Sequence, residues 1–479
     1  MERQTVILIT LVIYQLALVF IGFWAQRRTR DNQDFFLGGR ELGTIVASVS
    51  YAASSSSAWM LIGYSGAAFT LGLPAFWFIP CTALGHYISW KWIAPRLMAM
   101  SKEDNLLTVT DLLVGDAKGR IRTAIVVSAS LFILISFAFY VSAQFNASAT
   151  TFSNSFDISF QNSVLLGAGI ILIYTLLGGF WAVSVTDTLQ GLLMIIVSAI
   201  LPVVALIAVG GPAGLMAGLE AKVTAAQFSF TGDDSPALFI GFLMGVLGLG
   251  FGALGQPHLL IRFMALRDDK ALRQGRIIAT TWFVFVLSAM FIVGLCGHVL
   301  LGEIDDPESV FFGLTNSLLP AVMAGVVSAA VLSAIMSTAD SQLLVAASTV
   351  SHDLRLGYRS QLSPIVVSRI VIVVLCATSV WITLQLPSDI FSRVLFAWSA
   401  LGCAFGPIVV VRAIGYNTRP SAVLAAMIVG FSLTVYFNNF PQQPSPGLFE
   451  RVVPFVLGLV ILFSLPRARD KVAAQAPAE

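Results

Sequence analysis

Hydroxyl side chains are concentrated in a segment that is otherwise apolar. Five of the eight residues from Ser50 to Ser57 are serines, and Trp59 follows them closely. A second interruption, rich in glycine, runs from Gly248 to Pro257. Irregular backbone persists within hydrocarbon only where it is buried or lines a cavity, because lipid offers N–H and C=O groups no partner. Paired interruptions of this kind predict a transporter's ion and solute site. Close helix packing through small residues is the alternative.

A third polar group lies in the apolar run 318–350, where three hydroxyls and a carboxylate occur between Ser337 and Ser341. Sodium is a small, hard cation, and such cations prefer oxygen ligands. We expect a cage made of the hydroxyls of Ser337 and Thr338 and the backbone carbonyls of Ala53, Ser56 and Ala334. In the alternative, these hydroxyls only bond back to carbonyls of their own helix.

Two acids accompany these segments. Asp187 precedes the apolar run 188–209, and Asp340 lies one turn beyond the expected cage. An acid at a helix N-terminus is stabilised by the helix dipole, so Asp187 is also explained as a cap. Acids within membranes are usually functional, and we expect Asp187 to receive a cation leaving the site. Tyr140 and Trp59 are candidates for the wall of a solute pocket.

The composition indicates an all-α integral membrane protein. Of 479 residues, 57% are hydrophobic and 11% are charged, whereas soluble domains approach ~25% charged residues. Apolar runs of about 20 residues, long enough to span a bilayer, recur along the chain. The four cysteines form no CxxC pair and the four histidines no HExxH motif, so no disulfide, metal or enzymatic motif is predicted.

The apolar runs predict thirteen transmembrane helices, whose ends are placed to within a few residues. They lie near 5–25, 43–68, 73–94, 121–146, 162–182, 188–209, 237–260, 277–300, 318–350, 366–385, 389–411, 421–438 and 450–466. Lys and Arg concentrate on the cytoplasmic side of membranes. With the N-terminus outside and the C-terminus inside, all but four of the 27 Lys and Arg face the cytoplasm, the exceptions being Arg3, Lys222, Arg393 and Arg451.

The spans divide into two blocks of five helices, 43–209 and 237–411, and each block opens with an interrupted helix. Because five is odd, the blocks enter the membrane from opposite sides, which predicts an inverted repeat. The remaining segments are 1–42 (the first span and a cytoplasmic loop), 210–236 (an outside loop that carries short surface helices), 412–466 (the last two spans) and 467–479 (a cytoplasmic tail).

Several motifs together resemble the sodium:solute symporter family along nearly the whole chain. They are Leu37 to Arg40, Gly178 to Asp187, Gly255 to His258, Arg262 to Ala265, and Met336 to Thr338 with Gln342 to Leu344. The resemblance implies a LeuT-type fold. It also implies that Ala53, Ser56, Ala334, Ser337 and Thr338 hold sodium between the second and ninth spans, and that Arg40 and Asp187 matter for coupling.

The chain departs from the family pattern at three positions. Ser55 stands where the nearest family members carry an aspartate, so we expect weaker sodium affinity. Leu249 and Ala253 stand where those members carry tryptophan and tyrosine, so we expect a larger, less aromatic pocket lined also by Ser57, Trp59, Tyr140 and Pro257. Coupling or gating roles are expected for Arg40, Ser55, Asp187, Asp340 and Ser341.

The sequence therefore predicts a sodium-coupled symporter in the plasma (bacterial inner) membrane that imports a small organic solute by alternating access. The resemblance implies proline or a related amino acid or zwitterion. Sodium is the expected coupling ion, with no other cofactor, no nucleic acid and no obligatory protein partner. The alternatives are another solute class (an organic acid, a sugar acid or a urea-like solute) and a transporter-like sensor, although the short tail leaves no room for a signalling domain. A membrane enzyme is disfavoured because no HExxH or GxSxG motif is present.

Overall fold

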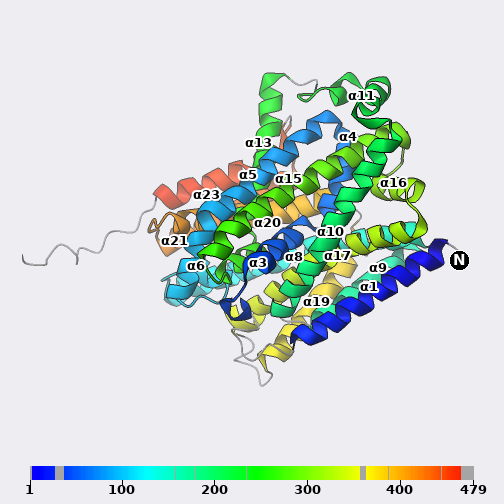
Figure 1. Cartoon of the computed structure of the whole chain (residues 1–479). Coiled ribbons are helices and arrows are strands. Elements are labelled where there is room, and N and C mark those ends of the chain that lie inside the picture. The colour runs from blue at the N-terminus through cyan, green and yellow to red at the C-terminus, as the bar shows by residue number, and fades with distance from the viewer. Residues whose placement is uncertain are drawn as a thin grey trace, which may run out of the picture.

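In the computed structural model, the described residues are 3–26, 37–156, 158–177, 180–232, 235–355, 363–386, 388–443 and 445–464. They form a bundle of helices (Figure 1), and the extended pairing among them is one isolated bridge between Leu42 and Leu266. The all-α prediction is therefore confirmed. The motif residues Gly178 and Gly179 and the expected tail 467–479 lie outside the described residues.

The first half of the chain contains α1 (Arg3–Gln26), η1 (Gly38–Arg40), α3 (Thr44–Ala58), η2 (Trp59–Gly63), α4 (Tyr64–Leu71), η3 (Leu73–Trp77), α5 (Phe78–Ile88), η4 (Ser89–Ile93), α6 (Ala94–Glu103), α7 (Val109–Val114), α8 (Gly119–Ser155), α9 (Phe160–Leu177) and α10 (Phe180–Ala208). The second half contains α11 (Gly211–Lys222), α12 (Ala225–Phe228), α13 (Pro236–Gly252), η5 (Ala253–Gly255), α14 (Pro257–Met264), α15 (Asp269–Leu300), η6 (Pro307–Ser309), α16 (Val310–Leu318), α17 (Ala321–Ser348), η7 (Thr349–Asp353), α19 (Pro364–Gln385), α20 (Ile390–Ala413), α21 (Pro420–Asn439), α22 (Pro446–Arg451) and α23 (Val453–Ser464).

Eleven helices in the described part of the chain are long and apolar enough to cross a membrane. Two predicted spans are not among them. The span 162–182 corresponds to the shorter apolar helix Phe160–Leu176, and the span 73–94 corresponds to α5, which continues through η4 into α6. The protein is therefore an all-helical, multi-pass membrane protein with at least these eleven candidate spans.

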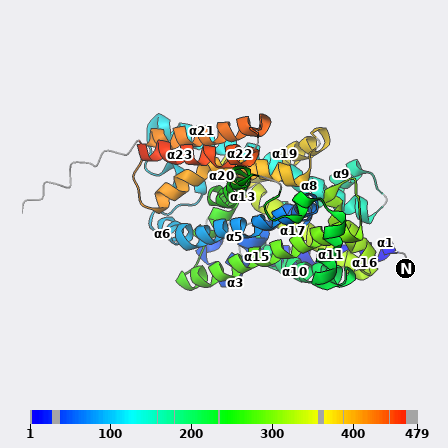
Figure 2. The same ribbon diagram turned by 90° about the horizontal axis from the view of Figure 1, so that it is seen from above.

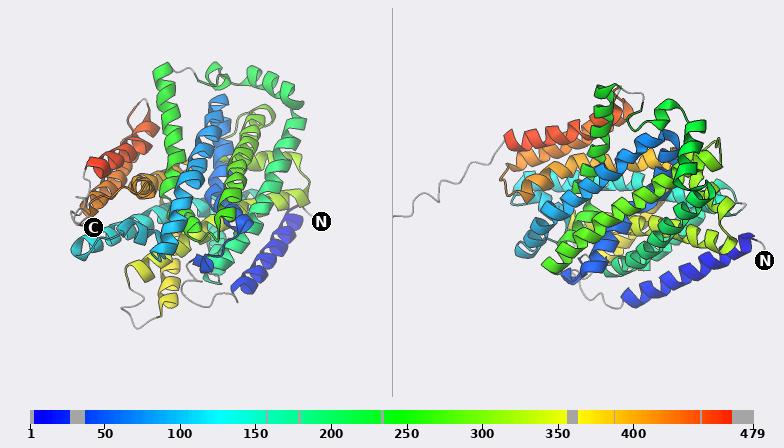
Figure 3. Two further views of the ribbon diagram at one scale, coloured as in Figure 1. Left: turned by 60° about the vertical axis from the view of Figure 1, so that its left-hand side comes forward. Right: turned by 45° about the horizontal axis from the view of Figure 1, so that its top comes forward.

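The helix α3 lies at the centre of the bundle and packs against α10, α15 and α17. The helix α1 runs along the outside, against α17 and α10 (Figure 1). On the other side, α21 and α23 pack together and against α20, as Figure 2 shows from above. The short helices α11 and α12 lie in the predicted outside loop, and the left view of Figure 3 shows them at one end of the bundle, between α10 and α13.

The first interrupted helix is broken at Ser57, where φ is 45° and ψ is −171° inside an otherwise helical segment. A positive φ is uncommon for a residue other than glycine, so the surrounding structure must hold this conformation. Side chains satisfy the freed backbone groups. The Ala58 N–H donates to Gln144 Oε1 at 3.2 Å, and Trp59 Nε1 donates to the Ser55 carbonyl at 3.1 Å. The break predicted from the serine-rich segment is therefore present.

The second interruption lies between α13 and α14. Gln256 is extended, with φ −84° and ψ 108°, and Pro257 begins the next helix. Proline suits the first helical position because its missing N–H has no partner there in any case. Gln256 Nε2 donates to the carbonyls of Gly252 (3.1 Å) and Trp398 (2.8 Å). Both sequence interruptions thus become helix breaks whose backbone groups are satisfied by buried side chains.

Candidate functional site

The hydroxyl-rich part of α17 faces the break in α3. The Ser337 hydroxyl lies 3.3 Å from the Ala53 carbonyl oxygen and 3.2 Å from the Ala334 carbonyl oxygen. All three residues are fully buried. Three of the five expected sodium ligands therefore meet at one point between the two helices. Hydroxyl and carbonyl oxygens are ligands of the type that hard cations prefer.

Of the other two expected ligands, Thr338 also contacts α3 from α17, and Ser56 lies in α3 three residues beyond Ala53. The Thr338 hydroxyl donates to the Ser54 carbonyl at 2.9 Å, across the same interface. The Ser56 carbonyl accepts the Trp59 N–H at the end of α3, while the Ser56 hydroxyl bonds to Ala52 O (2.7 Å) and accepts from Trp282 Nε1 (2.8 Å). The Ser56 carbonyl already accepts one hydrogen bond, and its place among the cation ligands stays a prediction.

Arg262 connects this region to Asp187. The sequence indicated Arg262 only as part of a shared motif and gave it no role. Its Nη2 lies 2.7 Å from Asp187 Oδ2. The same guanidinium donates to three serine hydroxyls, those of Ser50 (2.8 Å), Ser54 (2.6 Å) and Ser341 (2.7 Å). We call these five residues the Arg262 network. It joins α3, α10, α14 and α17 through charge-assisted hydrogen bonds.

Asp187 therefore has a cationic partner, and its role is not that of a simple helix cap. Ser50 also donates to Asp187 Oδ2 at 2.7 Å, and Asp187 Oδ1 is buried without a hydrogen-bond partner. Ser341, in turn, donates to the Ser337 carbonyl at 2.8 Å. Ser341 of the network is thus hydrogen-bonded directly to Ser337, one of the expected sodium ligands.

Asp340 faces a different part of the bundle. Its Oδ1 accepts a short hydrogen bond from the Thr175 hydroxyl of α9, and its Oδ2 is buried without a partner. On the same face of α17, the Ser333 hydroxyl bonds with the Tyr14 hydroxyl of α1 at 2.5 Å. The structure therefore does not bring Asp340 into the Arg262 network, although Ser341 next to it belongs there.

Arg40 and Ser55, the other expected coupling residues, also lie apart from each other. Arg40 donates to the carbonyls of Ser101 (3.1 Å) and Leu106 (3.0 Å), so it fixes the end of α6. Partial burial lowers the pKa of the Arg40 guanidinium. The Ser55 hydroxyl lies 3.5 Å from Nε2 of the buried His86.

Two of the expected solute residues, Trp59 and Tyr140, lie at the break at Ser57. The Tyr140 hydroxyl and Gln144 Nε2 each lie 3.5 Å from Ser57 Oγ. The Tyr140 ring neighbours the rings of His258 and Trp398, with centroids 6.2 and 6.5 Å away. An isolated Gln or Trp in an apolar run carries too weak a pattern to be singled out, so the sequence missed Gln144 and Trp398, and it indicated His258 only as part of a shared motif.

At the second break, Trp398 Nε1 donates to the Leu249 carbonyl at 2.9 Å. Leu249, Ala253 and Pro257 are all buried there. An aromatic ring is therefore present beside α13, and α20 supplies it. The expectation of a less aromatic region considered only the side chains of α13 itself.

Glu308, in the loop between α15 and α16, is a further buried acid that the sequence did not indicate. Its two carboxylate oxygens accept the Ile390 N–H (2.9 Å) and the Phe391 N–H (2.8 Å) at the start of α20. Burial raises the pKa of Glu308 to about 7, although the two N–H donors oppose this shift. The carboxylate thus joins this loop to the first turn of α20.

Known proteins resemble this chain along nearly its whole length. Residues 35–430 match the sodium:solute symporter family. The chain is 32% identical over 480 residues to the sodium/proline symporter of Escherichia coli (strain K12), which covers 97% of this chain and 94% of that protein. It is also 32% identical to the osmoregulated proline transporter OpuE of Bacillus subtilis (strain 168), over 95% of this chain and 93% of that protein.

Solved structures share the fold. A Na+-coupled sialic acid symporter, in a substrate-bound outward-open state, superposes with a TM-score of 0.77 at 16% identity, over 97% of this chain and 99% of that one. Mhp1, a nucleobase-cation-symport-1 family transporter in a closed conformation, superposes with a TM-score of 0.57 at 13% identity, over 91% of this chain and 94% of that one. At these identities the likeness concerns the fold.

Two broken helices that meet a hydroxyl-bearing helix inside an all-helical membrane bundle define a secondary transporter. The chain belongs to the sodium:solute symporter family. It is accordingly a sodium-coupled symporter of a small solute, a transporter and not an enzyme, with sodium as its coupling ion.

Proposed function

We propose that this symporter imports proline, or a small amino acid or zwitterion related to it, together with sodium. The observation that carries the proposal is the meeting of Ser337 Oγ with the Ala53 and Ala334 carbonyls beside the break in α3. The relatives that are 32% identical over nearly the full length are named as proline transporters, which supports proline as the first solute to test.

The proposed ion site consists of Ala53, Ser56, Ala334, Ser337 and Thr338. The proposed solute site consists of Ser57, Trp59, Tyr140, Leu249, Ala253 and Pro257, and coupling is assigned to Arg40, Ser55, Asp187, Asp340 and Ser341. The two sites share the break at Ser57, so a bound cation and a bound solute would each stabilise the broken backbone that the other contacts. This shared element supports coupling by linkage.

The proposed topology has thirteen spans, with the N-terminus outside and the C-terminus in the cytoplasm of a bacterial inner membrane. Two inverted five-helix repeats (43–209 and 237–411) follow the segment 1–42 and are separated by the outside loop 210–236. Spans 12 and 13 (412–466) and the tail 467–479 complete the chain. The positions of Lys and Arg support this orientation.

Alternating access would move the first two spans of each repeat as a unit against the remaining helices. Packing supports this grouping, because α15 contacts α3, α4 and α5, and α13 contacts α5. The pairing of Leu42 with Ala265 and Arg267, at 3.1 Å for both hydrogen bonds, also ties the start of α3 to the end of α14. The sodium ligands of α3 and α17 would then lie across the moving boundary.

The test is uptake of labelled proline into proteoliposomes, with competition by a panel of amino acids, organic acids, sugar acids and urea. We expect proline uptake that depends on an inward sodium gradient and is competed by small amino acids. The solute assignment would be overturned by sodium-dependent uptake of another compound, if proline were neither taken up nor able to compete. The symporter assignment would remain intact.

Another solute class is the second candidate, and one observation favours it. Leu249 and Ala253 stand where proline-transporting relatives were expected to carry rings, and the neighbouring ring comes from Trp398 of α20. Since affinity depends on walls that touch the ligand, a differently shaped wall favours a different solute. The double substitution Leu249→Trp and Ala253→Tyr should then increase the preference for proline in the same competition assay.

A further inference from the structure

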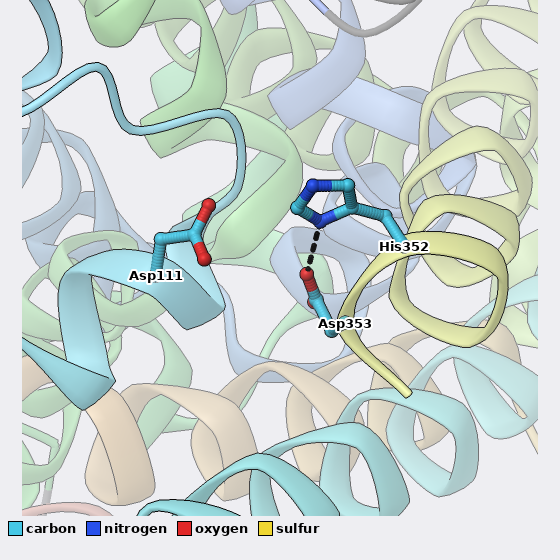
Figure 4. Close-up of side chains that lie close together, drawn as sticks. All are labelled: Asp111, His352 and Asp353. Atoms are coloured by element: carbon cyan, nitrogen blue, oxygen red, sulfur yellow. Dashed lines mark hydrogen bonds and ion pairs between the residues drawn. The ribbon is translucent and has the colours of Figure 1, made fainter. Parts of the chain in front are cut away.

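A second group of ligand-type side chains lies at one end of α17, outside the Arg262 network. It consists of Asp111 of α7 with His352 and Asp353 of η7. One ligand atom from each residue lies within 4.8 Å of the other two. Figure 4 shows the imidazole and the two carboxylates turned toward a common centre, with Asp111 contributed by a different helix from the other two.

This trio borders a cavity of about 560 Å³. The cavity is also lined by Asp104, Asn105 and two arginines, Arg122 and Arg355, so it is polar and has room for water molecules. The His352 side chain is 22% exposed, whereas that of Asp353 is 1% exposed. The His352 imidazole is therefore accessible from the cavity, whereas the Asp353 carboxylate lies on the buried side of the trio.

Hydrogen bonds already fix the orientation of both carboxylates. Asp111 Oδ2 accepts the N–H groups of Leu107 (3.1 Å) and Thr108 (3.2 Å) in a capping box at the start of α7. Asp353 Oδ1 accepts from the Thr108 hydroxyl at 2.8 Å and from His352 Nδ1 at 3.0 Å. Supporting hydrogen bonds of this kind orient the ligands of metal sites and tune their affinity.

The second carboxylate oxygen of Asp353 has few possible partners. Asp353 Oδ2 is buried and lacks a hydrogen bond of normal geometry, and the Thr110 side chain also interacts with this carboxyl. A buried carboxylate oxygen without a donor is costly, and a cation would remove that cost. This oxygen is a second observation, separate from the closeness of the three side chains, and it favours a positively charged ligand.

The geometry points to a divalent transition-metal site formed by Asp111, His352 and Asp353. One imidazole and two carboxylates are a ligand set that suits Zn²⁺ and similar ions. Water from the cavity would fill the remaining coordination positions. Bound metal would join α7 to the end of the helix that carries Ser337 and Thr338, so this site would be distinct from the sodium site and would tie down one end of α17.

The test is Zn²⁺ titration of the purified, tag-free protein by calorimetry. We expect one saturable Zn²⁺ site per chain. His352→Gln and Asp353→Asn should each weaken binding by at least about tenfold, as is typical when even a supporting residue of a metal site is lost. The matched control is Asp104→Asn, which removes one carboxylate from the same cavity but none of the three ligands, and should leave the affinity unchanged. Equal weakening by Asp104→Asn and Asp353→Asn would show diffuse attraction to an acidic cavity and overturn the site.

A measurement on the unmodified protein guards against variants that fail to fold. Carbethoxylation of histidines, read by mass spectrometry, should slow at His352 when Zn²⁺ is added and continue unchanged at the half-buried His298. Unchanged modification of His352 at saturating Zn²⁺, or no saturable Zn²⁺ binding to the unmodified protein, would overturn the proposal.

Discussion

Arg262 Nη2 and Asp187 Oδ2 lie 2.7 Å apart, and the two side chains are 1% and 0% exposed. Charges taken out of water in this way are tolerated only when they are paired and hydrogen-bonded. Ser50, Ser54 and Ser341 provide the additional bonds to the guanidinium. The pair therefore holds together four helices at the place where α3 and α17 meet.

Replacing one member of this pair should lower the stability of the protein much more than replacing both. Asp187→Asn leaves the Arg262 cation buried without a counter-charge, which costs on the order of 3–5 kcal/mol of folding free energy. Combining it with Arg262→Met should restore part of that stability. Thermal unfolding of the purified variants measures this. The matched control is Asp268→Asn, because the Arg267–Asp268 pair is exposed and should change little. Equal unfolding temperatures for Asp187→Asn and the unmodified protein would contradict the prediction.

The two hydroxyls of the expected sodium cage should set the sodium dependence of uptake. Ser337→Ala or Thr338→Ala removes an oxygen from a buried site, where an unreplaced partner costs about 1–3 kcal/mol. The half-saturating sodium concentration should therefore rise by roughly 5- to 150-fold, at ~1.4 kcal/mol per factor of ten. Ser348→Ala is the control, because its hydroxyl only bonds back to the Val345 carbonyl of the same helix. A similar rise in all three variants would mean that the effect is not ligand loss.

Ser55→Asp should tighten sodium binding by placing an acid in the broken span, where the family resemblance implies one. A charge a few ångströms from the cation is favourable, but its burial is costly, so the net gain is about 1 kcal/mol. His86 Nε2 lies 3.5 Å from the Ser55 hydroxyl and would compete for the new carboxylate. Adding His86→Ala should therefore enlarge the gain. Sodium dependence of uptake in the single and double variants measures both effects, and an unchanged dependence in each would place the ion elsewhere.

Glu308 should make stability fall as the pH rises. Burial raises the pKa of this carboxyl from 4.5 to about 7, so the folded protein binds the proton more tightly than the unfolded chain does. The stabilisation is complete below pH 4.5 and is lost as the pH rises through about 7. We expect a loss on the order of 1–3 kcal/mol, at 1.36 kcal/mol per pKa unit.

Thermal unfolding between pH 4.5 and 8 measures this loss in the unmodified protein and in Glu308→Gln, which cannot titrate there. The slope should flatten in Glu308→Gln and stay unchanged in Glu303→Gln, an exposed acid in the same loop. Identical slopes in all three proteins would show that Glu308 does not titrate in this range.

The sequence predicted the helix breaks because their causes are local. Serines from Ser50 to Ser57 and the pair Gln256–Pro257 weaken helical backbone wherever they occur, and both breaks appear at those positions. The meeting of Ser337 with Ala53 was proposed from the oxygen ligands that sodium prefers and was also implied by the family resemblance, because spacing alone cannot align residues 284 positions apart. The role of Arg262 and the position of Trp398 beside α13 were missed for the same reason. Each depends on the packing of a distant helix, to which no local pattern points.

The most direct test of the central claim is equilibrium binding of radioactive sodium to the purified protein in the absence of solute. We predict saturable sodium binding that is lost in the double variant Ser337→Ala, Thr338→Ala and retained in Ser348→Ala. Sodium binding of unchanged affinity in the double variant would contradict a cation site between α3 and α17.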